Sequence, residues 1–307
     1  MSKATREAYG ETLQQLVLED PKIVVLDADL SGSTKTAMAK KVAPERHFNM
    51  GIAEENMIGV AAGIASSGYT VFASSFAMFA TGRCWEQIRN SVVYPQLNVK
   101  ICGSHGGISV GEDGVSHQAT EDMAIMRSIP EMRVFCPADE FETKAIIKYI
   151  ASDKLPCYVR LGRSAVDEVY DENTVFEVGK VRTFNKGKKV AIFATGLMVQ
   201  ACMKALPVLK ELGMEPTIVD VSCIKPIDEE GVVEILKQHE HIITAEEHNV
   251  VGGLGSAICE VACKYHPVQI ERIGIQDTFA QSGNFKDLLV AYHLDDKAII
   301  DAVKKYY

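Results

Sequence analysis

Residues 56–82 read NMIGVAAGIASSGYTVFASSFAMFATG, a run of apolar and small polar residues without a single charge. An apolar helix of this length can span a bilayer, but Ser66, Ser67 and Gly68 interrupt the run in its middle. A buried helix, a turn and a buried strand account for the run better, because a parallel sheet covered on both faces makes its elements apolar all round. The run therefore predicts an α/β fold.

The segments on either side of this run alternate between helical and strand patterns, as in a parallel sheet with helices on both faces. In the first half, helices are predicted at residues 4–19, 54–66, 76–93 and 140–152, and strands at 22–26, 70–73, 99–103, 132–136 and 157–161. In the second half, strands are predicted at 190–194, 216–221, 242–245 and 268–273, and helices at 198–212, 229–238, after Gly253 and from Asp295. We expect an α/β protein with two parallel-sheet domains.

Between residues 162 and 189 the pattern weakens into Asp, Glu, Asn, Gly and Lys, which is typical of a short linker with an edge hairpin. The predicted organisation is a first domain at residues 1–170, a linker at 171–187 and a second domain at 188–307. Two domains also agree with a length of 307 residues.

The composition argues against nucleic-acid and membrane partners. With 32 basic and 41 acidic residues the formal net charge is -9, which repels phosphate backbones and anionic membranes. The N-terminal sequence MSKATREAYG lacks the apolar segment of a secretory signal, and the eight cysteines form no CxxC pair. We expect a cytoplasmic protein with reduced thiols.

Two carboxylates, Glu54 and Glu55, begin the predicted helix that opens the uncharged run. Complementing the helix dipole is the simpler interpretation of both. Consecutive helical residues point about 100° apart, so that only one of them can face a given pocket. A desolvated carboxyl group shares a proton readily, which suits it to hydrogen-bond a ring nitrogen.

Residues 105–117, HGGISVGEDGVSH, directly follow a predicted apolar strand, where loops of open α/β sheets carry ligand sites. Glycines let the backbone approach a ligand closely, while His105, Asp113 and His117 offer donors and acceptors that suit a polyhydroxylated substrate. Two alternatives stay open. The segment can be a plain structural turn, or the same three residues can bind zinc, although their spacing lacks the i, i+4 geometry of the common zinc motif.

Further candidates are two aromatic residues and two lone arginines. Phe76 and Phe79 lie three residues apart at a predicted helix start and so share a face, which is usually core but also suits stacking on a flat heteroaromatic cofactor. Arg6 lies near the N-terminus, and Arg163 follows a predicted buried strand, where it is well placed to bind phosphate.

Together these features resemble the transketolase family of thiamine-diphosphate enzymes, in the part that contains the pyrimidine-binding domain and the C-terminal domain. The resemblance covers essentially the whole chain and is strongest at residues 51–54 and 110–118. Transketolases carry one histidine eight residues before the aspartate of the second motif and another four residues after it. His105, Asp113 and His117 keep that spacing.

The resemblance implies thiamine diphosphate as cofactor and transfer of a two-carbon ketol unit from a ketose phosphate to an aldose phosphate. It implies that Glu54 hydrogen-bonds the aminopyrimidine nitrogen and that His117 faces the reacting ketol oxygen, which makes these two the catalytic residues. The implied cofactor contacts are the stacking of Phe76 and Phe79 on the pyrimidine, with Asp29 beside the thiazolium. The implied binders of the sugar phosphates are Arg6, Ser33, His105 and Arg163, with Asp113 on a substrate hydroxyl.

In this family a Gly-Asp-Gly motif and a downstream Asn-Asn pair hold the diphosphate through Mg²⁺ or Ca²⁺. The chain contains no Gly-Asp-Gly; its nearest string, Glu112-Asp113-Gly114, belongs to the predicted substrate loop. We therefore expect no metal ligands here and an N-terminal transketolase subunit as a partner that supplies them. The resemblance further implies a heterotetramer, inactivity of the chain alone and a place in the pentose phosphate pathway.

Other functions stay open. The β-subunit of a 2-oxo-acid dehydrogenase component has the same domain pair, although His105 and the spacing to His117 favour a sugar-phosphate site. A deoxyxylulose-phosphate synthase usually has an arginine-containing turn where His105 lies. A transketolase for a branched or sulfonated sugar is a third alternative. A non-catalytic regulatory subunit is the fourth, against which the intact residues Glu54, His105, Asp113 and His117 argue.

Overall fold

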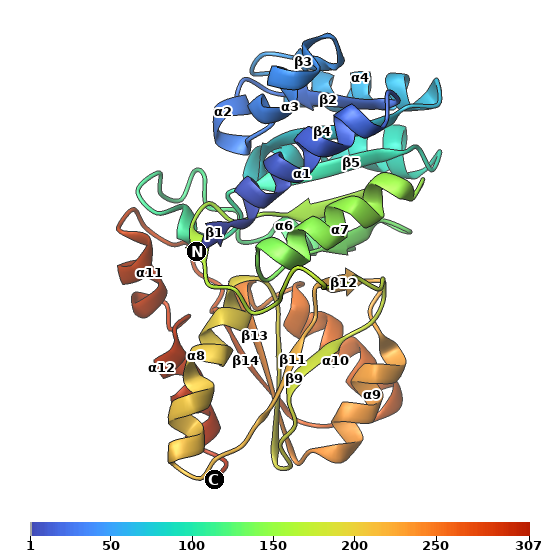
Figure 1. The fold of residues 1–307 in the computed structure, drawn as a ribbon. Helices are drawn as coiled ribbons and strands as arrows, with labels where there is room; N and C mark the ends of the chain where they lie inside the picture. The colour runs from blue at the N-terminus through green and yellow to red at the C-terminus, as the bar shows by residue number, and fades with distance from the viewer. Residues whose placement is uncertain (1) are drawn as a thin grey trace.

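The structure is a computed structural model that describes residues 2–307. Two sheets lie one above the other, each between layers of helices (Figure 1). The first sheet has the strand order β12-β6-β7-β5-β4-β2-β3, and the second has the order β14-β13-β10-β11-β9. Most neighbours in both sheets run parallel, and the antiparallel strands β12 and β9 lie at the edges. The expected α/β fold with two parallel-sheet units is confirmed.

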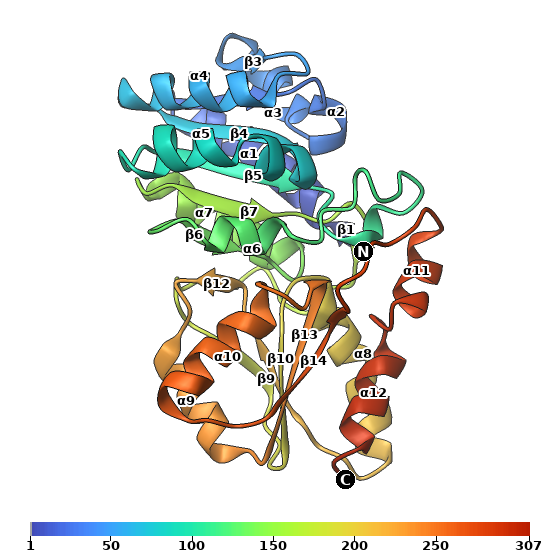
Figure 2. The same ribbon diagram turned by 180° about the vertical axis from the view of Figure 1, so that it is seen from behind.

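The first sheet lies between two helical layers. Its strands are β2 (Ile23–Asp27), β3 (His47–Asn49), β4 (Thr70–Phe76), β5 (Val99–Ser104), β6 (Arg133–Phe135), β7 (Cys157–Arg160) and β12 (Cys223–Lys225). One face carries α1 (Thr5–Glu19), α3 (Ala37–Val42) and α7 (Glu140–Ser152); the other carries α4 (Glu54–Ser66), α5 (Trp85–Gln87) and α6 (Asp122–Arg127), which Figure 2 shows in front. The short helix α2 (Ser31–Thr34) follows β2.

The second sheet has the same layered arrangement. Its strands are β9 (Arg182–Asn185), β10 (Val190–Ala194), β11 (Thr217–Asp220), β13 (His241–Asn249) and β14 (Ile270–Ile275). Its helices are α8 (Leu197–Glu211) and α12 (Asp296–Lys304) on one side, α9 (Glu229–Gln238) and α10 (Leu254–Tyr265) on the other, and α11 (Phe285–Ala291) beside the first unit.

The prediction of an edge hairpin between residues 162 and 189 is wrong. β8 (Ala165–Val166) pairs with the N-terminal strand β1 (Lys3–Ala4), and β9 pairs with β11 instead of with β8. In addition β12, from the second half of the sequence, completes the first sheet. A strand from the second half of the chain therefore belongs to the first sheet. The domain boundaries at residues 170 and 188 stay a prediction.

The uncharged run folds as a helix, a turn and a strand. Helix α4 ends at Ser66, Gly68 adopts a φ of +88°, and β4 is buried along its whole length. The following helical segment begins later than expected and contains two π-helical stretches, η2 (Met78–Arg83) and η3 (Ile88–Val93). Phe76 is the last residue of β4, so the expectation that Phe76 and Phe79 share a helical face is wrong.

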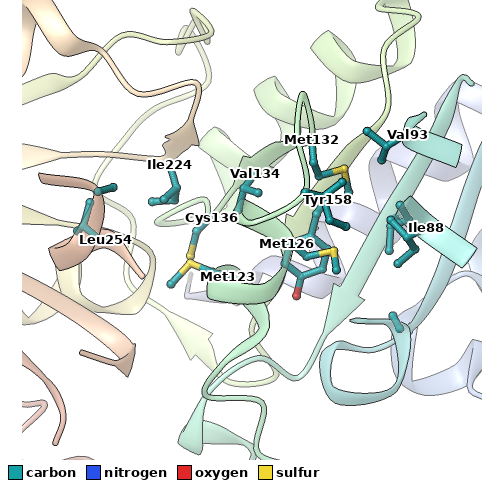
Figure 3. Close-up of a cluster of buried hydrophobic side chains, with 14 of the residues drawn as sticks. Ile88, Val93, Met123, Met126, Met132, Val134, Cys136, Tyr158, Ile224 and Leu254 are labelled. Atoms are coloured by element: carbon teal, nitrogen blue, oxygen red, sulfur yellow. The ribbon is translucent and has the colours of Figure 1, made fainter. Parts of the chain in front are cut away.

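One buried apolar cluster runs through both units. In Figure 3, Met123, Met126, Met132, Val134 and Cys136 lie between Ile88 and Val93 of the first unit and Ile224 and Leu254 from the second half of the chain. Fully burying a side chain of this kind contributes about 1.5–3 kcal/mol relative to exposure. All eight cysteines are free. No helix within residues 2–307 has both the length and the apolar character that a bilayer crossing requires.

Candidate active site

The predicted site residues gather at the carboxyl ends of four adjacent strands of the first sheet. Asp29 and Ser33 follow β2, Phe76 ends β4, His105 follows β5 and Arg163 follows β7. The carboxyl edge of a parallel sheet is where open α/β folds bind ligands, because the loops that leave neighbouring strands converge there.

Four aromatic rings form the centre of this edge. The His105 ring stacks on Phe76 at 3.9 Å between centroids, and the Phe79 ring lies 6.0 Å from Phe76 with an interplanar angle of 18°. His117 presents its ring at a steep angle to both phenylalanines, at 5.2 Å from Phe79 and 6.0 Å from Phe76. Stacking between Phe76 and Phe79 is therefore achieved from a strand end and a π-helix.

Two arginines, Arg6 and Arg163, lie near His105. Arg6 donates hydrogen bonds to the Ser33 carbonyl at 2.8 Å and to the Arg163 carbonyl at 3.2 Å, and its Nη1 lies 3.4 Å from His105 Nε2. A guanidinium can only donate, so His105 Nε2 accepts and the ring proton is on Nδ1. That proton points to Ser104 Oγ, 2.9 Å away.

The His105 imidazole is neutral at physiological pH. Burial lowers its pKa to about 3, and the charges of Arg6 and Arg163 act in the same direction. The positive charge of this part of the site therefore comes from the two guanidinium groups. Arg163 donates to the Val110 carbonyl and to Glu112 Oε2, the latter at 3.1 Å, so it also holds the 105–117 loop.

Glu54 is the first residue of α4 and its side chain is only 4% exposed, whereas its neighbour Glu55 is exposed. The expectation that the two carboxylates differ in exposure is confirmed. Nη1 of Arg83 lies 2.9 Å from both Glu54 oxygens. Arg83 was not predicted as a site residue, although it is the first charge after the uncharged run.

A second-half residue shapes the glycine-rich loop. Glu247 of β13 accepts a hydrogen bond from the Ser109 amide at 2.6 Å, and burial raises its pKa. Gly107 has a φ of +83°, and a Cβ there would lie 2.3 Å from Glu247 Oε1. Arg160 donates to the Glu247 carbonyl at 2.9 Å. The signal that the sequence offered was a set of titratable residues, Glu246, Glu247 and His248, inside a buried strand.

The remaining predicted residues, Asp29 and Asp113, are exposed. Asp29 has a φ of +61° and exchanges two hydrogen bonds with Asn49, at 2.9 and 3.0 Å. The buried Asp27 beneath it accepts from the Leu30 amide and the Thr34 hydroxyl, which fixes the loop that carries Asp29.

Within residues 2–307, no group of three or more His, Cys, Asp and Glu side chains is placed to hold a metal ion. The alternative of a zinc site made of His105, Asp113 and His117 is therefore not supported. The three residues belong to one loop, but the histidine rings pack against phenylalanines.

The fold and the site together define the class of protein. A first α/β unit presents a buried carboxylate, stacked rings and two arginines at its strand ends, and a second α/β unit follows. The family model described as "Transketolase, pyrimidine binding domain" matches residues 1–168, and the one described as "Transketolase, C-terminal domain" matches residues 179–299. The chain belongs to the transketolase family.

Individual relatives cover almost all of the chain. It is 50% identical to a transketolase C-terminal section of Methanocaldococcus jannaschii, over 97% of this chain and 94% of that protein. It is 37% identical to a 6-deoxy-6-sulfo-D-fructose transketolase subunit of Clostridium sp. (strain MSTE9), over 97% and 92%. A solved structure described as a split gene transketolase, inactive β4 tetramer, matches with a TM-score of 0.90 at 47% identity, over 100% of this chain and 98% of that one.

Proposed function

We propose that this chain is one subunit of a split thiamine-diphosphate-dependent transketolase. With its partner it transfers a two-carbon ketol unit from a ketose phosphate to an aldose phosphate. The observation that carries the proposal is the buried Glu54 carboxylate, which Arg83 links to the stacked Phe79 and Phe76 rings, at the carboxyl edge of a transketolase pyrimidine-binding fold.

This set of residues fits the aminopyrimidine end of thiamine diphosphate. A flat heteroaromatic ring stacks on Phe76 and Phe79, and Glu54 shares a proton with the ring nitrogen, which favours the imino tautomer. Asp29 would be the residue near the cofactor's thiazolium. When bound, the cofactor supplies the thiazolium carbon that carries the ketol unit, which is chemistry that no side chain provides.

The sugar phosphates bind along the other residues of the same edge. Arg6 and Arg163 bind the phosphate by charge-assisted hydrogen bonds, together with Ser33 and with His105, which the Arg6 guanidinium contacts. Further along the edge, His117 faces the ketol oxygen and Asp113 binds a substrate hydroxyl.

The diphosphate and its metal bind to a partner chain. The 307 residues contain no Gly-Asp-Gly motif to hold Mg²⁺ or Ca²⁺ beside the diphosphate. Support comes from the descriptions of the relatives as a "C-terminal section" and a "subunit", and of the solved structure as an inactive β4 tetramer. We propose an N-terminal transketolase subunit as the partner, in a cytoplasmic heterotetramer that acts in the pentose phosphate pathway.

The direct test is to produce the chain together with a Gly-Asp-Gly-containing subunit from the same source and to assay ketol transfer. The donor panel contains xylulose 5-phosphate, fructose 6-phosphate and 6-deoxy-6-sulfo-fructose, since one relative is described as acting on the last. Transfer by the pair and none by the chain alone is the expected result. Purified chain that turns over donor and acceptor without a partner contradicts the split arrangement.

Glu54→Ala in the assembled pair is expected to reduce turnover by about 10²–10⁴-fold, the range for loss of a group that moves a proton in the transition state. Assembly, measured by size-exclusion chromatography, is expected to stay unchanged. Glu55→Ala, at the exposed neighbouring position, is the matched control and retains activity. Unchanged turnover in Glu54→Ala would show that Glu54 is not the acid that the reaction needs, and it would favour a non-catalytic subunit.

A further inference from the structure

The two ends of the uncharged run meet in space. Glu54 lies two residues before the run and Arg83 directly after it, and Arg83 Nη1 lies 2.9 Å from Oε1 and from Oε2 of Glu54. The Glu54 side chain is 4% exposed and the Arg83 side chain is 48% exposed. Among residues 2–307, no other group donates a hydrogen bond to this carboxylate, so Arg83 alone supplies its hydrogen bonds and its nearest counter-charge.

Arg83 also contacts the second group of the proposed pyrimidine site. Its guanidinium carbon lies 4.2 Å from the centroid of the Phe79 ring, which is within the range of a cation–π interaction. Arg83 is the last residue of the π-helix η2, and Phe79 lies in the same stretch. π-Helices are rare and occur frequently at functional sites, because the wider turn redirects the side chains that it carries.

The guanidinium therefore makes the contacts that the proposed cofactor ring requires. It is planar, it carries N–H donors toward Glu54, and it lies over the face of Phe79. An aminopyrimidine ring that hydrogen-bonds Glu54 and stacks on Phe79 competes with Arg83 for both groups.

The geometry of the Arg83–Glu54 ion pair also allows it to break easily. A single nitrogen reaches both carboxylate oxygens, so the two-nitrogen fork that makes the strongest arginine–carboxylate pairs is absent from this contact. Because half of the side chain is already exposed, Arg83 can keep its charge in water when it leaves. Glu54, in contrast, is buried and stays in place at the start of α4.

We propose that Arg83 is a positioning residue that occupies the place of the aminopyrimidine ring while the site is empty. It pairs with the buried Glu54 and orients it, and it withdraws when the ring docks. This proposal rests on the proposed function, since it assigns thiamine diphosphate as the ligand that displaces the guanidinium.

The first test is thiamine diphosphate affinity of the assembled pair, measured by isothermal titration calorimetry with Mg²⁺ present. Arg83→Met removes the competing contact and keeps the apolar stem, so the dissociation constant is expected to fall by roughly two- to five-fold, the factor that corresponds to an ion pair with one exposed member. Arg89→Met, at an exposed position of η3, is the matched control and leaves the affinity unchanged. An unchanged or weaker affinity in Arg83→Met overturns the proposal.

The second test uses the chain alone without cofactor, in a double-mutant cycle read by urea unfolding. Arg83→Met is expected to lower the unfolding midpoint when Glu54 is present and to leave it unchanged in a Glu54→Gln background, where no buried charge needs a partner. Additive effects overturn the proposed pairing. If Arg83→Met does not fold, Arg83→Gln, which removes the charge but keeps a donor, replaces it, and effects of the same direction and smaller size are expected.

The two tests separate this proposal from the proposed function. If the wild-type pair binds no thiamine diphosphate, the proposed function fails, while coupling between Arg83 and Glu54 in the isolated chain still reports the ion pair. If the wild-type pair binds the cofactor but Arg83→Met gains no affinity, displacement is wrong and the proposed function stands.

Discussion

Arg6 and Arg163 provide the positive charge at one end of the candidate active site, while the neighbouring His105 ring stays neutral. The cause is the burial of the ring, assisted by repulsion from the two guanidinium groups, which lowers its pKa to about 3. A neutral imidazole between cations can accept a hydrogen bond from Arg6 and so orient it. The proposed phosphate binding at this end would then depend on the arginines and not on a titrating histidine.

Arg163→Ala is expected to raise the KM for phosphorylated acceptors by about ten-fold or more, since a hydrogen bond to a charged group contributes about 1.5–3 kcal/mol. Steady-state kinetics of the assembled pair would measure it. An acceptor without phosphate is the matched control, because its KM does not depend on this contact. Equal losses for both acceptors would show that Arg163 acts by holding the Val110 carbonyl and Glu112.

At the scale of elements, the main helices and strands were predictable and the short or irregular ones were not. Helix α4 and strand β4 followed from an apolar run with a Ser-Ser-Gly interruption. The π-helices η2 and η3 did not, because their composition is that of an α-helix and the wider turn arises from packing. Asp29 and Arg163 could be proposed as site residues from the sequence. Arg83 and Glu247 could not, because each is linked to the site by a contact between residues far apart in sequence.

The contact between β13 and the 105–117 loop makes Gly107 a sensitive position. Gly107→Ala places a Cβ against Glu247 at a φ of +83°, so we expect the free energy of unfolding to fall by about 1–3 kcal/mol. Urea unfolding monitored by circular dichroism is the measurement. Gly32→Ala is the control, because a Cβ at Gly32 meets nothing within 4 Å. A Gly107→Ala variant as stable as the control would mean that the loop shifts away from β13.

At the scale of the whole molecule, two buried carboxyl groups meet between the units. Glu142 lies in α7 and Asp220 in β11, and Tyr170 from the connecting segment donates to Asp220 at 2.6 Å. Burial raises the pKa of Asp220 to about 6, and burial together with the Asp220 charge raises the pKa of Glu142. Both groups are therefore easier to protonate in the folded chain than in the unfolded chain.

The sign of the pH dependence follows from these shifts. The stabilisation is fully present below the unfolded pKa values near 4 and is lost as pH rises through the folded value of Asp220, about 6. Asp220 alone should lower the free energy of unfolding by about 1–2 kcal/mol between pH 5 and pH 7, and Glu142 should add to this fall in the same direction. Glu142→Gln, which cannot ionise, should reduce the slope of the free energy of unfolding against pH. Glu211→Gln, at the exposed end of α8, should not. Equal slopes in all three proteins would exclude the carboxyl pair as the cause.

Strand β12 links the two halves of the chain in a way that limits how they can be separated. It pairs with β6 through Cys223 and Lys225, and the Lys225 ammonium donates to the Arg127 and Ile129 carbonyls. A fragment that stops at residue 170 would leave the outer edge of β6 without its partner, and unpaired edges recruit other chains. Expression of the first half alone should therefore yield aggregates, because the strand that completes this sheet lies in the second half of the sequence.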